Sequence, residues 1–235
     1  MRQIDKLYTD FPFYGSRSMA GHLGRQHNIH LNRKRIQRLM RIMGIEAVFP
    51  KPNTSKPHPE HPIYPYLIRD IKASYPDHIW GVDITYIPVR GSWLYLYAVL
   101  DWYSRYIISW ELSDTMEAGF CAGALDKALN QAHPDIHNSD QGSQFTSQEY
   151  LSQLWQYPEI QISMDGRGRA YDNIFTERLW RTIKYNEVYL NDYSSPKEAR
   201  ESLARFINLY NQERVHSSLN YYTPAQVYTE AVIIN

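Results

Sequence analysis

The sequence predicts an α/β protein in which a mixed sheet follows a small helical N-terminal region. Three features of the 235-residue chain support this class. Positive charge is concentrated at the N-terminus, six of the 13 prolines lie between residues 48 and 66, and strand-like and helix-like apolar runs begin near residue 78. We therefore expect a helical region at 1–47, a proline-rich linker at 48–75, and an α/β core at 76–235 that ends in a helical extension.

The formal net charge is zero, but the charge is unevenly distributed. Residues 1–56 hold 11 Lys or Arg and three Asp or Glu, whereas residues 57–235 hold 14 and 22. This asymmetry predicts a basic module joined to an acidic domain, and a basic module suits nucleic acid. The alternative is a solvated surface with uneven charge.

Targeting signals and cysteine chemistry are not predicted. The longest apolar run, at 93–100, is too short to span a membrane, and the N-terminus lacks the apolar core of a signal peptide. One cysteine excludes an internal disulfide framework and a Cys-rich zinc site. We expect a cytoplasmic protein with no membrane partner.

Residues 14–44 have the pattern of two short helices. We expect Ser16 to cap the first, which runs to about Gln26, and Asn32 to cap the second, which ends near Gly44. The second helix has an apolar stripe and a separate basic face that carries Arg33, Lys34, Arg38 and Arg41. This pair predicts a helix-turn-helix-like DNA-binding region. The alternative is a solvated basic face on a helical hairpin.

The core is expected to begin with three antiparallel strands. Runs rich in β-branched and aromatic residues lie at 79–88, 93–101 and 106–112. Helices are then predicted at 116–132, 147–157, 173–186 and 197–213, with strands at 135–139 and 160–163. Three antiparallel strands followed by alternating helices and strands is the order of the ribonuclease H-like fold.

Three carboxylates are positioned to meet at one edge of such a sheet. Asp83 lies within a strand, Asp140 lies at a strand end, and Glu177 lies in the first turns of a helix. Divalent Mg²⁺ prefers oxygen ligands, and a pair of ions about 3.5–4 Å apart suits phosphodiester chemistry. Each acid also has an ordinary alternative, namely a turn bond to the 141–142 backbone for Asp140 and an ion pair with Arg181 for Glu177. Asp101 is expected to be a turn carboxylate.

Several motifs together resemble those of one family. Residues 80–86, 138–147, 163–168, 172–173 and 177–184 resemble the DDE integrase core of IS3-family insertion-sequence transposases, in the second open reading frame product. This core is related in fold to retroviral integrases. Residues 14–17 and 32–40 resemble the family's second helix-turn-helix region. The family's C-terminal signature is matched by Arg214, His216, Leu219 and Thr223-Pro224.

The resemblance implies that Asp83, Asp140 and Glu177 are the catalytic residues and hold two Mg²⁺ or Mn²⁺ ions. It implies metal-dependent cleavage and strand transfer on transposon terminal inverted repeats and target DNA, within a homo-oligomer and with, or fused to, the upstream open reading frame product. Lys184 corresponds to a residue that contacts the DNA end, and Arg181 shares its helix face. Further DNA contacts are expected from Gln144, Arg167 and Arg169.

One departure from the family pattern is expected to lie in a loop. The chain has 36 residues between Asp140 and Glu177, one more than is usual in the family, and the extra residue is predicted within 156–159. Two other functions stay open from the sequence. One is a non-catalytic or fusion-dependent DNA-binding product, because the additional upstream helix-turn-helix of the fused family protein is absent. The other is a ribonuclease H-like nuclease.

Overall fold

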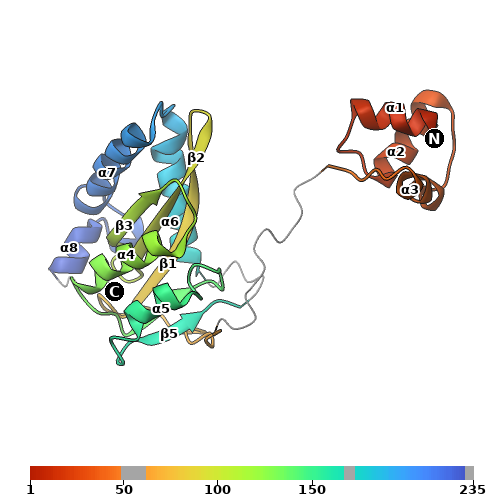
Figure 1. Cartoon of the computed structure of the whole chain (residues 1–235). Helices are drawn as coiled ribbons and strands as arrows, with labels where there is room; N and C mark the ends of the chain where they lie inside the picture. The colour runs from red at the N-terminus through yellow and green to blue at the C-terminus, as the bar shows by residue number, and fades with distance from the viewer. Residues whose placement is uncertain (49–61, 167–172, 231–235) are drawn as a thin grey trace. The chain divides into compact units, whose positions relative to one another are not determined.

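A computed structural model of the chain describes residues 1–48, 62–166 and 173–230. It contains two compact units, residues 1–54 and 55–235 (Figure 1). The three-part division with boundaries at 47 and 75 stays a prediction. Most of the prolines of the predicted linker lie outside the described residues.

The N-terminal unit consists of three helices around a small apolar core. They are α1 (Arg2–Asp10), α2 (Ser16–His27) and α3 (Arg33–Ile42). Each contributes two buried side chains to the core, namely Ile4, Leu7, Met19, Leu23, Ile36 and Met40. Helix α1 was not predicted from the sequence, because only two of its positions are buried and its apolar pattern is short.

The helix ends in this unit agree only partly with the predicted caps. The Asn32 side chain accepts a hydrogen bond from the Lys34 backbone nitrogen at 2.9 Å and caps α3, as predicted. The prediction that Ser16 caps α2 is wrong, because Gly15 occupies the N-cap position and Ser16 is already the first helical residue. Gly44 follows the end of α3 with a φ of 68°, a conformation that glycine adopts without strain.

The core unit contains a five-stranded mixed sheet. Its strands are β1 (Ile79–Val89), β2 (Ser92–Asp101), β3 (Ile107–Ser113), β4 (Ile136–Ser139) and β5 (Gln161–Met164), in the order β3-β2-β1-β4-β5. The first three pair antiparallel, and β4 and β5 continue the sheet parallel to β1. This confirms the predicted ribonuclease H-like arrangement.

Helices cover both faces of this sheet (Figure 1). Odd-numbered residues of β1, such as Ile79 and Ile87, pack with α6 (Ile174–Asn186) and α7 (Pro196–Gln212). Even-numbered residues, such as Trp80 and Val82, pack with α4 (Ala118–Leu129) and α5 (Gln148–Leu154). The period-2 alternation of a strand therefore separates two cores, one on each face.

The chain after α6 adds short elements that were not predicted as helices. They are η2 (Val188–Leu190), η3 (Ser217–Leu219) and α8 (Pro224–Thr229). The start of α8 has a capping box, in which Thr223 and Gln226 exchange side-chain and backbone hydrogen bonds. No helix within the described ranges is long and apolar enough to cross a membrane.

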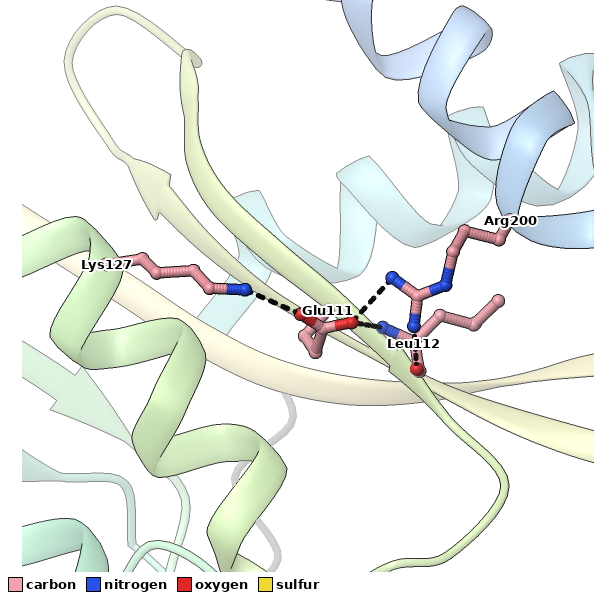
Figure 2. A network of polar contacts seen from close by, with 4 residues as sticks. All are labelled: Glu111, Leu112, Lys127 and Arg200. Atoms are coloured by element: carbon pink, nitrogen blue, oxygen red, sulfur yellow. Dashed lines mark hydrogen bonds and ion pairs between the residues drawn. The ribbon is translucent and has the colours of Figure 1, made fainter. Parts of the chain in front are cut away.

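A polar network at the edge strand β3 connects the two helical layers (Figure 2). The Glu111 carboxylate on β3 lies 2.8 Å from Lys127 Nζ of α4 and 2.6 Å from Arg200 Nη1 of α7. Arg200 also donates to the Leu112 carbonyl. Burial opposes ionisation of Glu111, but the hydrogen bonds from Lys127 and Arg200 outweigh it and lower its pKa. The network therefore fastens α4 and α7 to the same strand.

Candidate active site

The pairing of β1 with β4 brings Asp83 and Asp140 to the same level of the sheet. The two strands run parallel, and Gly81 lies opposite Asn138 in the last registered pair. Asp83 and Asp140 each lie two residues beyond that pair, and adjacent strands are about 4.8 Å apart. The two carboxylates therefore lie on neighbouring strands, Asp83 in the middle of β1 and Asp140 directly after the end of β4.

The Asp83 side chain connects the sheet to α6. Its Oδ2 accepts a hydrogen bond from Trp180 Nε1 at 2.8 Å, and its Oδ1 accepts one from the Ile84 backbone nitrogen at 2.7 Å. Trp180 is one helical turn after Glu177, so both side chains project from the same side of α6. The contact that holds Asp83 therefore also brings Glu177 towards the strand.

The pKa of Asp83 responds to the other two acids. Burial raises the pKa of Asp83 to about 6, and the hydrogen bonds from Trp180 and Ile84 oppose this rise. The negative charges of Asp140 and Glu177 raise the pKa further. Asp83 thus lies in the fields of both other acids, as expected for carboxylates that share a site.

Asp140 is held by the turn that follows β4. The Gly142 backbone nitrogen donates to Asp140 Oδ1 at 2.7 Å, which is the turn bond predicted as the ordinary alternative. Asp140 is exposed at the surface, yet the surrounding protein removes part of its hydration and raises its pKa, against the lowering effect of the Gly142 bond. A Cβ at Gly142 would lie 2.8 Å from Asp140 Oδ1, so this turn requires a glycine.

Close packing of α6 on β1 fixes the distance between Glu177 and the strand. A Cβ at Gly81 would lie 2.1 Å from Trp102 Nε1 and 2.9 Å from Thr176 Oγ1. Asn173, just before α6, donates to the Val82 carbonyl at 3.2 Å and accepts from Thr176. The glycine and the Asn173 bond allow the helix to start directly against the strand that carries Asp83.

Comparisons with known proteins identify this arrangement. Residues 73–170 and 158–224 match two families described as integrase core domain, and residues 1–53 match an HTH-like domain. The transposase for insertion sequence element IS904 of Lactococcus lactis is 34% identical over 213 residues, which are 84% of this chain and 81% of the relative. The transposase InsF for IS3A of Escherichia coli is 32% identical over 68% of this chain and 57% of the relative. The chain belongs to the IS3 family of insertion-sequence transposases.

Solved structures agree with the fold of this transposase. The HTLV-2 integrase catalytic core domain in complex with magnesium superposes with a TM-score of 0.55 at 22% identity, covering 67% of this chain and 99% of that chain. A simian T-cell lymphotropic virus intasome gives a TM-score of 0.59 at 17% identity, covering 96% and 74%. The transposase is a DDE polynucleotidyl transferase of DNA transposition, and its family uses divalent metal.

The three acids suit a hard divalent cation chemically, although they are not preassembled around one. All their donor atoms are carboxylate oxygens, the ligands that Mg²⁺ prefers. Within the ranges that the structure describes, no three His, Cys, Asp or Glu side chains are grouped so that they could hold a metal ion. Asp83 and Asp140 instead bond to Trp180, Ile84 and Gly142. Their role as ligands of this transposase stays a prediction.

The predicted DNA-contacting residues lie in different environments. On α6, Arg181 is exposed with its guanidinium carbon 5.7 Å from the centre of the Tyr185 ring, and Lys184 is half-buried. Glu177 and Arg181 are both described residues, but the predicted ion pair between them does not form. The four residues of α3 that were predicted to contact DNA are all exposed, namely Arg33, Lys34, Arg38 and Arg41.

Three other predicted DNA contacts have different outcomes. Gln144 donates from Nε2 to the Met116 carbonyl at 3.0 Å, so its amide nitrogen braces the loop after β4 against the segment before α4. Arg167 and Arg169 lie outside the described residues.

Asp101 is a turn carboxylate, as predicted. It is fully buried and accepts hydrogen bonds from the Ser104 nitrogen and hydroxyl at 2.7 and 2.6 Å and from the Asp77 nitrogen at 2.9 Å. Burial raises its pKa to about 6, against these bonds. Trp180 was not predicted to have a role at the site, yet its indole nitrogen donates a hydrogen bond to Asp83. The spacing of Trp180 from Glu177 is the signal that would have indicated it.

Proposed function

We propose that Asp83, Asp140 and Glu177 form the catalytic site at which this transposase cuts and joins DNA with two bound Mg²⁺ or Mn²⁺ ions. The observation that supports this site best is the position of Asp83. It shares a strand register with Asp140, a hydrogen bond with the helix of Glu177, and the electrostatic field of both.

Each side chain has a part in this proposal. The metal ions supply charge neutralisation at the phosphate and an activated oxygen nucleophile. Asp83, Asp140 and Glu177 hold the ions, and Trp180 orients Asp83 through its 2.8 Å hydrogen bond. In the reaction, a water or 3′-hydroxyl oxygen attacks phosphorus and gives its proton to solvent, while the opposite P–O bond breaks and the leaving oxygen takes a proton from solvent to become a hydroxyl. Arg181 and Lys184, on the face of α6 that carries Glu177, meet the phosphates of the DNA end.

The N-terminal unit is proposed to add affinity for DNA. The exposed basic residues of α3 suit phosphate contacts, which dominate affinity and weaken as salt is added. The expected ligands are the terminal inverted repeats of the insertion sequence and the target DNA. The expected active form is a homo-oligomer in the bacterial cytoplasm, with or fused to the upstream open reading frame product.

Strand transfer with defined DNA ends tests the catalytic site. The probe is a labelled duplex that ends in the terminal bases of the insertion sequence encoding this chain, mixed with a target plasmid and Mg²⁺ or Mn²⁺. We expect joined product from the wild type and none from Asp83→Asn, Asp140→Asn or Glu177→Gln, with DNA binding retained. Glu201→Gln, which makes the same chemical change at an exposed position of α7, is the matched control.

The products separate the three functions that the sequence leaves open. Joined product supports the transposase, whereas cleavage without joining by the wild type favours a nuclease. A gel shift without either reaction favours a non-catalytic DNA-binding product. Undiminished joining by any one of the three acid variants removes that residue from the mechanism.

A further inference from the structure

A cavity of about 510 Å³ lies between α6, the end of α7 and the segment that follows α7. Three arginines and one histidine line it, namely Arg105, Arg178, Arg214 and His216. None of the described residues that line it is acidic. The ion pairs between described residues also include none made by these arginines. The cavity therefore concentrates positive charge with no carboxylate in its described lining, although the negative charge of Asp101, outside the lining, acts on Arg105.

Two of the three arginines, Arg105 and Arg214, are held in place by contacts other than ion pairs. The guanidinium carbon of Arg105 lies 3.5 Å from the centre of the Phe175 ring, and Arg105 also donates to the Trp102 carbonyl. Arg214 Nη1 lies 3.2 Å from His216 Nε2. Stacking and hydrogen bonding of this kind leave the other guanidinium donors available in fixed directions, which favours the binding of an anion with several oxygens.

The charges converge on the same space. Burial lowers the pKa of His216 to about 4, and the positive charges of Arg214, Arg105 and Arg178 lower it further. Burial also lowers the pKa of Arg105 to about 10. His216 is thus neutral at pH 7, and the positive charges of all three arginines act on it. The positive charges of all three arginines would attract an anion bound in this space.

The position of Arg178 connects this cavity with DNA. Arg178 follows Glu177 directly on α6, and its side chain leaves the helix about 100° around the axis from Glu177. Ile174, Arg178 and Thr182 form a stripe of α6 that lines the cavity, next to the stripe that carries Glu177, Arg181 and Lys184. A DNA strand lying along α6 can therefore reach both stripes.

We infer that this cavity binds a phosphodiester of the DNA backbone through Arg105, Arg178, Arg214 and His216. The phosphodiester belongs to the strand that lies next to the strand being cut. This inference rests on the proposed function, because it requires DNA at Glu177. It gives the C-terminal segment around Arg214 and His216 a role in holding substrate. The cavity volume exceeds that of one phosphate and suits a nucleotide unit, with the aromatic rings of Phe175, Tyr210 and Tyr221 at its wall.

The first test measures DNA binding without catalysis. The full chain is titrated with the same terminal duplex in EDTA over a range of salt concentrations. We expect Arg178→Gln to bind about 10-fold more weakly and to reduce the slope of log K against log salt by about one. The control is Arg205→Gln, an exposed arginine of α7 that does not line the cavity, and it should match the wild type. Unchanged affinity and slope for Arg178→Gln overturn the inference.

The second test identifies the bound group. Single phosphates of the duplex are replaced, one at a time, by neutral methylphosphonates. At the contacted position the replacement should weaken wild-type binding about 10-fold and have no further effect on Arg178→Gln. The absence of any such position overturns the inference. Arg214→Lys, which keeps the charge but loses the planar fork, should also weaken binding, and its thermal unfolding checks that it is folded.

Two further outcomes identify a different ligand in the cavity and a failure of the proposed catalytic site. If inorganic phosphate stabilises the wild type but not Arg178→Gln, and no methylphosphonate position couples to Arg178, the cavity binds free phosphate and the DNA assignment is overturned. These binding measurements do not depend on catalysis. If Glu177→Gln still joins DNA, the proposed catalytic site fails whether or not the methylphosphonate coupling is found.

Discussion

Replacing Asp83 with asparagine is expected to stabilise the metal-free transposase at neutral pH while it abolishes catalysis. Burial and the neighbouring carboxylates raise the pKa of Asp83 to about 6 in the folded state. The ordinary value in an unfolded chain is about 3.9. Between these values the folded state binds the proton more tightly, so the free energy of unfolding falls as pH rises from about 4 to 6 and stays reduced above that.

The magnitude follows from the size of the pKa difference. About two pKa units correspond to roughly 3 kcal/mol, and the half-buried position of Asp83 reduces this through solvent screening to about 1–3 kcal/mol. Asparagine has nearly the same shape, and its Oδ1 can still accept the hydrogen bond from Trp180, although its amide nitrogen cannot accept the one from Ile84. The substitution therefore removes the charge and leaves most of the packing intact.

Urea unfolding in EDTA, followed by tryptophan fluorescence between pH 4.5 and 8, measures the effect. All six tryptophans lie at or beyond residue 80, so the signal reports on the core unit alone. The difference between the two proteins isolates Asp83, because other shifted groups such as Asp101 and His137 are present in both. We expect Asp83→Asn to gain about 1–3 kcal/mol over the wild type at pH 8 and little at pH 4.5.

The same experiment with Mg²⁺ gives an independent check. Added Mg²⁺ should stabilise the wild type and narrow the difference, because a ligand that binds only the folded state raises its stability. A difference that does not change with pH, or an Asp83→Asn protein that is less stable than the wild type at pH 8, refutes the reasoning.

Two further predictions concern the contacts that hold the core together. Glu111→Gln should lower the free energy of unfolding by about 1–2 kcal/mol at pH 7, because Lys127 and Arg200 lose their shared carboxylate. The pKa of Glu111 is lowered in the folded state, so the difference in unfolding free energy between the two proteins should shrink as pH falls through that pKa. A difference in urea unfolding that stays constant down to pH 3 would contradict this. Gly81→Ala should cost about 1–3 kcal/mol and reduce strand transfer at temperatures where the protein stays folded, because its Cβ would meet Trp102 and Thr176. Gly123→Ala, whose Cβ would meet no atom within 4 Å, is the control and should keep full activity.

The succession of strands and helices along the chain, and the face of the strand on which Asp83 lies, could be predicted. Both depend on the local pattern of apolar residues. The β-branched neighbours Val82 and Ile84 specify a strand with one buried apolar face. Asp83 must then point to the opposite face, where α6 lies. Asp101 could be assigned to a turn for a similar reason, since Ser104, three residues later, donates to it from its backbone and its hydroxyl.

The contacts that shape the site could not be predicted, because they join residues far apart in the chain. Trp180 reaches Asp83 across 97 residues, and Asn173 reaches Val82 across 91. Gln144 resembles a surface amide in its motif, yet its partner is a backbone carbonyl 28 residues earlier. Such pairings follow from how α6 and the loop after β4 dock, which no local propensity encodes.

The hydrogen bonds of the metal-free acids do not argue against a metal site. An ionised carboxylate has about four lone-pair directions, so one bond from Trp180 to Asp83 Oδ2 and one from Ile84 to Oδ1 leave room for ligation. The bonds limit rotation of the Asp83 carboxylate, so less side-chain entropy is lost when a cation binds. The burial and like-charge repulsion that raise the pKa of Asp83 are relieved by a divalent cation. The features that raise the pKa of Asp83 are therefore the same ones that would favour a bound cation.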